Sequence, residues 1–248
     1  MSLLTAERIK LFSTRAPWWC TAIAIAASLG FTALFVGLSG EEVSMSVANT
    51  QVAASFGRTV ILVLAVLAAS TEFNWGTMRI TFQAVPSRKP ALLAKGVVVG
   101  AWSALVGLVV GFGAWLIGTL LAPDVDLALN SGADWRAVAG QAPLFLLTGL
   151  LGVGVGLLLR NTGFALAVVL VWTQLVEGLV LLIPGIGDDL YKWMPFFAAG
   201  QFTGSDFAMS AMKLGDLPMG PLGYGLYFAA LCLALFAAGV LVTDRRDS

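Results

Sequence analysis

Long apolar runs alternate with short polar segments along the whole chain. Six of these runs are long enough to cross about 30 Å of hydrocarbon as helices, which takes roughly 20 residues. The predicted spans cover residues 17–38, 54–71, 96–121, 141–159, 162–183 and 223–242. Because the runs are continuous rather than alternating with a period of two, they indicate helices and not the strands of a barrel. The pattern predicts an all-α polytopic membrane protein whose 248 residues form a single transmembrane domain.

Composition agrees with this class and excludes several kinds of chemistry. Hydrophobic residues make up 58% of the chain and charged residues 11%, whereas soluble domains carry about 25% charged residues. The chain has no histidine, which removes the usual general base and the commonest metal ligand. We therefore predict neither catalytic residues nor a metal site. Cys20 and Cys232 lie inside apolar runs and are interpreted as small core residues.

The placement of positive charge predicts the orientation of the spans. With the N-terminus inside the cell, ten of the 14 Lys and Arg residues fall on the inner side. The other four, Arg58, Arg136, Lys192 and Lys213, fall on the outer side. Most Asp and Glu residues show the opposite bias. We expect a multi-pass protein of the cytoplasmic membrane of a bacterial cell, with both termini in the cytoplasm.

The N-terminal segment, residues 2–16, has helical spacing of its own. Leu3, Ile9 and Phe12 recur on one side, and arginine and lysine lie on the wet side. This is typical of an amphipathic helix lying in the membrane interface. The alternative is that the segment is only a positively charged flank of the first span.

The outer segment, residues 184–221, is the longest connection between two spans. It contains Y-K-W-M-P-F-F-A-A-G-Q-F and is broken by Pro195 and Gly200. We predict interfacial or re-entrant half-helices that cover the outer face before the last span. An ordinary loop with Tyr191 and Trp193 as interface anchors stays open as an alternative.

The polar segment between spans two and three predicts a short helix over residues 72–85. Ser70 or Thr71 can cap it, Glu72 suits the dipole of its first turn, and Pro86 ends it. Its bulky apolar side chains are Phe73, Trp75, Ile80 and Phe82. Such a helix at the cytoplasmic surface fits a groove of a partner protein. A solvated basic loop that only sets the topology would explain the composition equally well.

Several residues of this segment carry a resemblance to a known family. They are Glu72, Gly76, Thr77, Arg79, Pro86-Ser87-Arg88 and Lys95. Together they resemble the E-x-x-x-G-T-x-R…P-x-x-R…K pattern of ABC type-2 transporter permeases. The resemblance extends to the N-terminal helix, the six spans, the tight turn at Arg160 and the outer half-helices.

The resemblance implies that residues 72–85 are a coupling helix that docks on an ATPase. The implied contact residues are Glu72, Phe73, Trp75, Gly76, Thr77, Arg79, Phe82 and Arg88. It also implies a dimer of permeases, identical or paralogous, with two nucleotide-binding subunits and no nucleic-acid partner. The chain has no G-x-x-x-x-G-K-[ST] phosphate loop, so ATP and Mg²⁺ are expected in the partner and no cofactor in this chain.

Two charges inside predicted spans form a second candidate site. Arg58 lies in span two and Glu177 in span five, both displaced toward the outer side. Because charges in a bilayer are costly and usually paired, we predict that they pair. Thr173 and Gln174 lie one turn before Glu177 and are predicted to share its face. In the family resembled, spans two and five line the translocation pathway. A structural ion pair, or Arg58 reaching the outer headgroups, is the alternative.

Glycine pairs four residues apart recur in the spans. They are Gly96/Gly100, Gly107/Gly111 and Gly152/Gly156. Such pairs allow helices to approach closely, so we interpret them as packing sites. A gating hinge is the alternative.

These features predict the permease subunit of an ATP-binding cassette exporter for a hydrophobic or amphipathic substrate, such as a drug, lipid or peptide. The first alternative is a secondary transporter of a small solute or ion, although no inverted repeat is visible. A membrane-bound enzyme is disfavoured, because histidine is absent and the spans hold no clustered carboxylates. A non-transporting assembly subunit also stays open.

Overall fold

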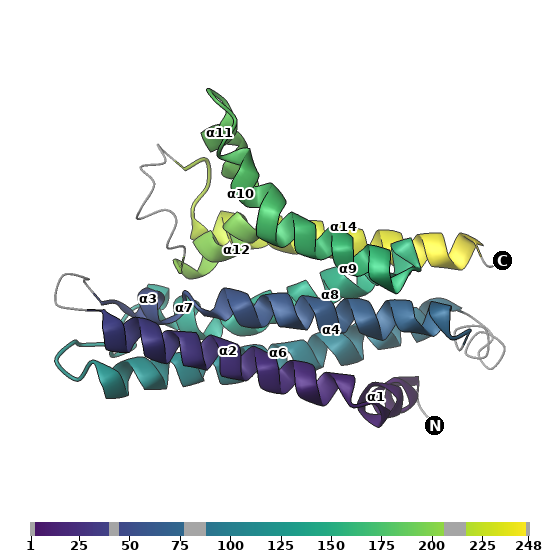
Figure 1. The fold of residues 1–248 in the computed structure, drawn as a ribbon, viewed down its shortest axis with the longest axis horizontal. Coiled ribbons are helices and arrows are strands. Elements are labelled where there is room, and N and C mark those ends of the chain that lie inside the picture. The colour runs from purple at the N-terminus through teal and green to yellow at the C-terminus, as the bar shows by residue number, and fades with distance from the viewer. Residues whose placement is uncertain (1–2, 40–44, 77–87, 206–216, 247–248) are drawn as a thin grey trace.

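The computed structural model describes residues 3–39, 45–76, 88–205 and 217–246. Within these ranges every regular element is a helix, and six segments are long and apolar enough to cross a membrane. The predicted all-helical class and the multi-pass character are therefore confirmed. Both termini lie at the same end of the helix bundle (Figure 1), as an even number of spans requires.

The elements follow one another in this order: α1 (Leu3–Ser13), α2 (Ala16–Leu38), α3 (Val47–Thr50), α4 (Ala54–Asn74), α6 (Arg88–Leu121), α7 (Gly132–Ala139), α8 (Gln141–Leu159), α9 (Thr162–Val171), the π-helix η1 (Trp172–Val176), α10 (Glu177–Val180), α11 (Gly187–Tyr191), α12 (Pro195–Thr203) and α14 (Pro221–Arg246).

α8 is the central helix, in contact with α4, α6 and α14 (Figure 1). Its glycines explain why three helices can approach it. A Cβ at Gly152 would lie 2.6 Å from the Cβ of Ala65 in α4, and one at Gly154 would lie 2.7 Å from the carbonyl oxygen of Leu235 in α14. Side chains at these positions would push the helices apart. The predicted glycine pairs all face neighbouring helices, which supports the packing interpretation.

α4 is longer than predicted, and no new helix begins at Glu72. The hydroxyls of Ser70 and Thr71 donate to carbonyls four residues earlier, at 2.7 and 2.6 Å. They therefore bond back along α4 instead of capping a second helix. Glu72 and Phe73 belong to the last turn of α4, which corrects the predicted start of the coupling helix. The rest of that helix, residues 77–85, lies outside the described residues.

α6 begins at Arg88, eight residues before the predicted start of span three. The predicted span begins at residue 96 because the apolar run starts directly after Lys95. Lys95 is instead buried, with only 4% of its surface exposed. Its charge is balanced by carboxylates from other helices, so the helix continues through it.

The fifth span is interrupted. α9 gives way to the π-helix η1, and α10 ends at Val180 rather than at the predicted residue 183. A π-helical turn holds an extra residue and shifts the faces of the residues that follow it. Two short helices, α11 and α12, occur in the outer segment where half-helices were predicted, and α12 packs against α14 and α7.

Candidate functional site

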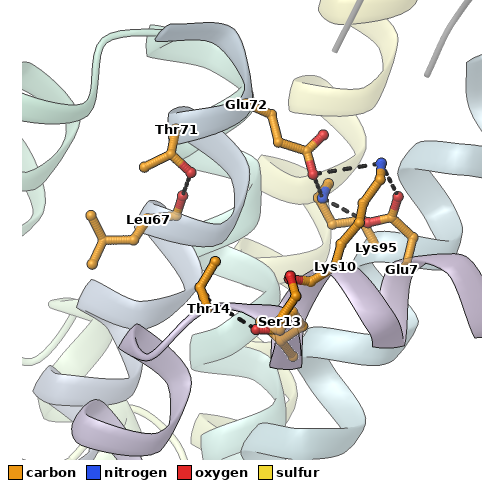
Figure 2. A network of polar contacts seen from close by, with 9 residues as sticks. Glu7, Lys10, Ser13, Thr14, Leu67, Thr71, Glu72 and Lys95 are labelled. Atoms are coloured by element: carbon orange, nitrogen blue, oxygen red, sulfur yellow. Dashed lines mark hydrogen bonds and ion pairs between the residues drawn. The ribbon is translucent and has the colours of Figure 1, made fainter. Parts of the chain in front are cut away.

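Four charged side chains from three helices meet at one end of the bundle (Figure 2). Glu7 and Lys10 come from α1, Glu72 from the last turn of α4, and Lys95 from α6. Nζ of Lys95 donates to Oε2 of Glu7 at 2.7 Å and to Oε1 of Glu72 at 2.6 Å. Nζ of Lys10 lies 2.8 Å from Oε1 of Glu7 and 3.7 Å from Oε1 of Glu72. We call these four residues the ionic cluster.

The ionic cluster is mostly shielded from solvent. The side chains of Lys95 and Glu7 are 5% and 6% exposed, that of Glu72 is 13% exposed and that of Lys10 is 37% exposed. Removing a charge from water costs several kcal/mol unless a partner compensates it. Two carboxylates and two ammonium groups balance one another here. The cluster therefore holds α1, α4 and α6 together as long as all its members are present.

Glu7 lies outside the spans. The neighbouring groups of the ionic cluster change the pKa of its carboxyl group. Burial acts to raise the pKa of its carboxyl group, but the charge of Lys95 and hydrogen bonds from Lys10 and Lys95 act in the opposite direction. The net effect is a pKa below the ordinary value of 4.5. Glu7 is therefore ionised at neutral pH and holds its two lysine partners.

Aromatic contacts fix α1 on the same side of the bundle. The ring of Phe12 lies 5.4 Å from that of Trp18 in α2 and 4.7 Å from that of Trp102 in α6. The indole N–H of Trp102 donates to Oγ1 of Thr21 at 2.9 Å. Leu11, one turn after Glu7, is buried in a core cluster with residues of α4 and α6. Leu11 and Phe12 thus pack α1 on the protein and place Glu7 beside Lys95, whereas Ile9 of the predicted apolar side is 51% exposed.

A cavity of about 410 Å³ lies next to the ionic cluster. Its walls come from α1, the turn into α2, α4 and α6. The lining residues are Glu7, Lys10, Leu11, Ser13, Thr14, Ala16, Pro17, Leu64, Leu67, Ala68, Thr71, Glu72, Trp75, Lys95, Val98 and Val99. The cavity is thus apolar along most of its length and charged at one end.

This end of the bundle, which we call the basic end, carries most of the described cations. They are Arg8, Lys10, Arg15, Arg88, Lys89, Lys95, Arg160 and Arg245. Arg160 forms the left-handed turn between α8 and α9, with φ of 53°, and its guanidinium lies 5.0 Å from the ring centre of Phe73. The tight turn predicted at Arg160 is thereby placed beside the end of α4.

The residues predicted to contact an ATPase differ from one another in burial and in the groups they contact. Glu72 belongs to the ionic cluster, and Phe73 packs against the core beneath Arg160. Trp75 is 80% exposed, and Gly76 follows it with φ of +71°. Arg88 is the first residue of α6. Thr77, Arg79 and Phe82 lie outside the described residues, so their contact with a partner stays a prediction.

The residues predicted to line a pathway lie on two neighbouring helical segments. Arg58 is buried in α4, with 5% of its surface exposed. The adjacent Thr59 accepts a hydrogen bond from Nε2 of Gln174 at 3.4 Å, and Oγ1 of Thr173 lies at the same distance from that nitrogen. Gln174 is exposed whereas Glu177 is buried, so the π-helix separates two side chains expected on one face. The pairing of Arg58 with Glu177 stays a prediction.

Glu177 has a structural role that was not predicted. Its carboxylate accepts hydrogen bonds from the backbone N–H groups of Phe196 at 3.0 Å and Phe197 at 3.2 Å. These are the second and third residues of α12, which begins with Pro195. The indole N–H of Trp172 donates to the same carboxylate at 3.1 Å. Glu177 therefore caps α12 from the end of span five, as a negative charge suits a helix N-terminus.

The sequence offered only part of this arrangement. Pro195, which was predicted to break the segment, is the first residue of α12, a position that suits proline. The capping carboxylate lies in another segment. The residue pattern likewise contained no sign that Glu7 would meet Lys95. Among the described residues, no three His, Cys, Asp or Glu side chains gather as a metal site would require.

Comparison with known proteins adds no relative. No protein-family model matches the chain, and a search of curated proteins returns no significant match.

Proposed function

We propose that the chain is the membrane-spanning subunit of an ATP-driven exporter of the ABC type-2 kind. The observation that carries the proposal is the ionic cluster. Lys95 joins the last turn of α4 to α1 and α6, and residues 77–87 come between these two helices, α4 and α6, in the sequence. A push on this connection would reach three helices that are held together by buried charges.

The proposal assigns the connection between α4 and α6 to an ATPase partner. Trp75 supports this assignment, because a tryptophan that is 80% exposed stands directly before the connection and large aromatic side chains are frequent anchors of interfaces. ATP and Mg²⁺ would be bound by that partner. A second permease, identical or paralogous, would complete the transporter. The basic end would face the cytoplasm, with both termini.

The proposed mechanism transmits movement from the ATPase to spans two and five. α4 carries both Glu72 of the ionic cluster and Arg58, and it packs against α9. Closure of the partner subunits would displace the end of α4, and the interrupted segment from α9 to α10 would adjust. A pathway between such apolar spans suits a hydrophobic or amphipathic substrate.

The test is purification of the tagged chain with its natural partners under mild detergent. We expect an ATPase to co-purify and to be lost on Arg79→Glu or Phe82→Ala. A matched control is Asp189→Lys, since this carboxylate is 81% exposed at the opposite end of the bundle. Purification without an ATPase, together with transport by the chain alone in vesicles without ATP, would overturn the proposal.

One observation favours a second candidate, a secondary transporter of a small solute or ion. Interrupted helices with a buried charge at the break occur at transporter binding sites, and Glu177 lies directly after η1. Transport by the reconstituted chain would then depend on an ion gradient and not on ATP. Glu177→Gln would abolish that coupling.

A further inference from the structure

The cavity beside the ionic cluster changes from apolar to charged along its length. Along α4 its lining residues run from Leu64, Leu67 and Ala68 to Thr71 and Glu72. Eight residues of helix separate Leu64 from Glu72, which is roughly 12 Å at about 1.5 Å per residue. α6 repeats the order in the same direction, because Val98 and Val99 precede Lys95 when read toward the basic end.

This gradient matches the depth of one membrane leaflet. Half of a hydrocarbon core of about 30 Å is about 15 Å, close to the roughly 12 Å of helix between Leu64 and Glu72. A volume of about 410 Å³ falls within the usual range of ligand sites, about 300–1,000 Å³. It suits one alkyl chain rather than a whole two-chain lipid. The cavity thus has the polarity and depth of a site for an amphiphile that stands in the leaflet at the basic end.

The charged groups at the basic end of the cavity, which we call its mouth, determine whether a cationic or an anionic headgroup of an amphiphile can bind there. Lys10 is the most exposed member of the ionic cluster, with 37% of its side chain exposed. Arg15 is exposed and lies between Thr14 and Ala16, which both line the cavity. In residues 3–39 the only acidic side chain is Glu7, which is buried. The lining charges Glu7, Lys10, Glu72 and Lys95 balance one another, so Arg15 beside the cavity leaves a net positive charge there. This end therefore favours an anionic group, and a phosphate suits lysine and arginine donors.

We propose that this cavity binds one acyl chain of an anionic phospholipid, whose phosphate lies at Lys10 and Arg15. The chain would lie along Leu64, Leu67 and Ala68 of α4, beneath the elbow between α1 and α2. Because binding needs only the walls of the cavity, it does not depend on an ATPase partner. The lipid would fill the space between α1 and α4 and add apolar contacts that the ionic cluster does not make.

Native mass spectrometry of the purified full-length chain tests the proposal. The chain is titrated with phosphatidylglycerol, with phosphatidylcholine and with oleate. We expect one retained phosphatidylglycerol, bound roughly tenfold more tightly than phosphatidylcholine because a charged contact contributes about that much. Equal binding of the two phospholipids, or equal binding of oleate, would overturn the assignment of an anionic phospholipid.

Paired variants locate the binding. Ala68→Phe fills the cavity and should weaken retention at least about tenfold, whereas Ala26→Phe adds the same side chain to an exposed position of α2 and should not. Lys10→Gln should reduce phosphatidylglycerol binding to the level of phosphatidylcholine. Lys89→Gln, which removes a 57% exposed cation at the same end, should leave it unchanged.

Folding is checked by gel filtration and thermal unfolding of each variant. Val98→Phe fills the same space from α6 and replaces Ala68→Phe if that variant does not fold. Retention of the lipid by a folded, cavity-filled variant would overturn the proposal. The co-purification of an ATPase is measured separately, so failure of this proposal is distinguishable from failure of the transporter proposal.

Discussion

Nζ of Lys95 lies 2.6 Å from Oε1 of Glu72, so the last turn of α4 is held against α6 by a buried ion pair. The same ammonium group reaches Glu7 of α1 at 2.7 Å. Lys95 therefore links three helices, α1, α4 and α6, at this end of the bundle. The consequences can be tested one residue at a time.

Lys95→Met should destabilise the protein strongly. The substitution removes the ammonium group that the two carboxylates share, and breaking a buried ion pair costs about 3–5 kcal/mol. Thermal unfolding in detergent measures the change. Lys89→Met is the matched control, because that lysine is 57% exposed and an exposed pair contributes about 1 kcal/mol at most. Equal effects of the two substitutions would contradict the role of the cluster.

The docking of α1 should depend on pH through Glu7. Its pKa is lowered in the folded protein from the ordinary 4.5. Its contribution to stability is therefore complete above about pH 4.5–5 and is lost as the pH falls through the lowered pKa. We expect the unfolding temperature to fall between neutral pH and about pH 3. Glu7→Gln should be less stable at pH 7 and should show a flatter pH profile. Identical profiles would exclude Glu7 as the titrating group.

Glu177→Ala should loosen α12. The carboxylate accepts from two backbone N–H groups of its first turn, and loss of such a cap costs about 1–2 kcal/mol. A cysteine placed at the buried Thr203, with Cys20 and Cys232 replaced, should react faster with a thiol reagent in this variant. Asp189→Asn serves as the control, since its side chain is 81% exposed. Unchanged reactivity would show that α12 is held by its packing alone.

Gly152→Ala should separate α8 from α4. Its new Cβ would lie 2.6 Å from the Cβ of Ala65 and 2.9 Å from the carbonyl oxygen of Leu62, distances at which one helix must move. Overpacking of this kind costs about 1–3 kcal/mol. Gly30→Ala adds the same methyl group where nothing lies within 4 Å and should leave the unfolding temperature unchanged. The prediction fails if both variants unfold alike.

Hydropathy predicted the helix boundaries well where the transfer of an apolar run into lipid is the only determinant. The predicted boundaries of α2, α4, α8 and α14 agree with the structure to within four residues, because a membrane selects apolar runs long enough to cross it. The helix α6 begins eight residues before the predicted span, where the charge of Lys95 is compensated by carboxylates from another part of the chain. Hydropathy also did not predict that η1 interrupts span five.

The candidate site was only partly accessible to sequence reasoning. The sequence predicts Glu72 as a contact residue, but it presents the partner Lys95 only as part of a family motif. Glu7 and Lys95 are 88 positions apart, and neither has a periodicity that points to the other. The shared polar face expected for Thr173, Gln174 and Glu177 assumed α-helical geometry, which η1 does not have.

The sequence by itself determined that this protein belongs in a lipid membrane, that it is helical, that it has six candidate spans and that charge is distributed unevenly between their ends. These properties depend on the free energy of transferring local segments into lipid, which is a sum over neighbouring residues. The tertiary structure alone decided which charges meet. Burial of Lys95, the capping of α12 by Glu177 and the cavity beside α4 depend on contacts between distant segments, where one partner removes the cost of burying the other.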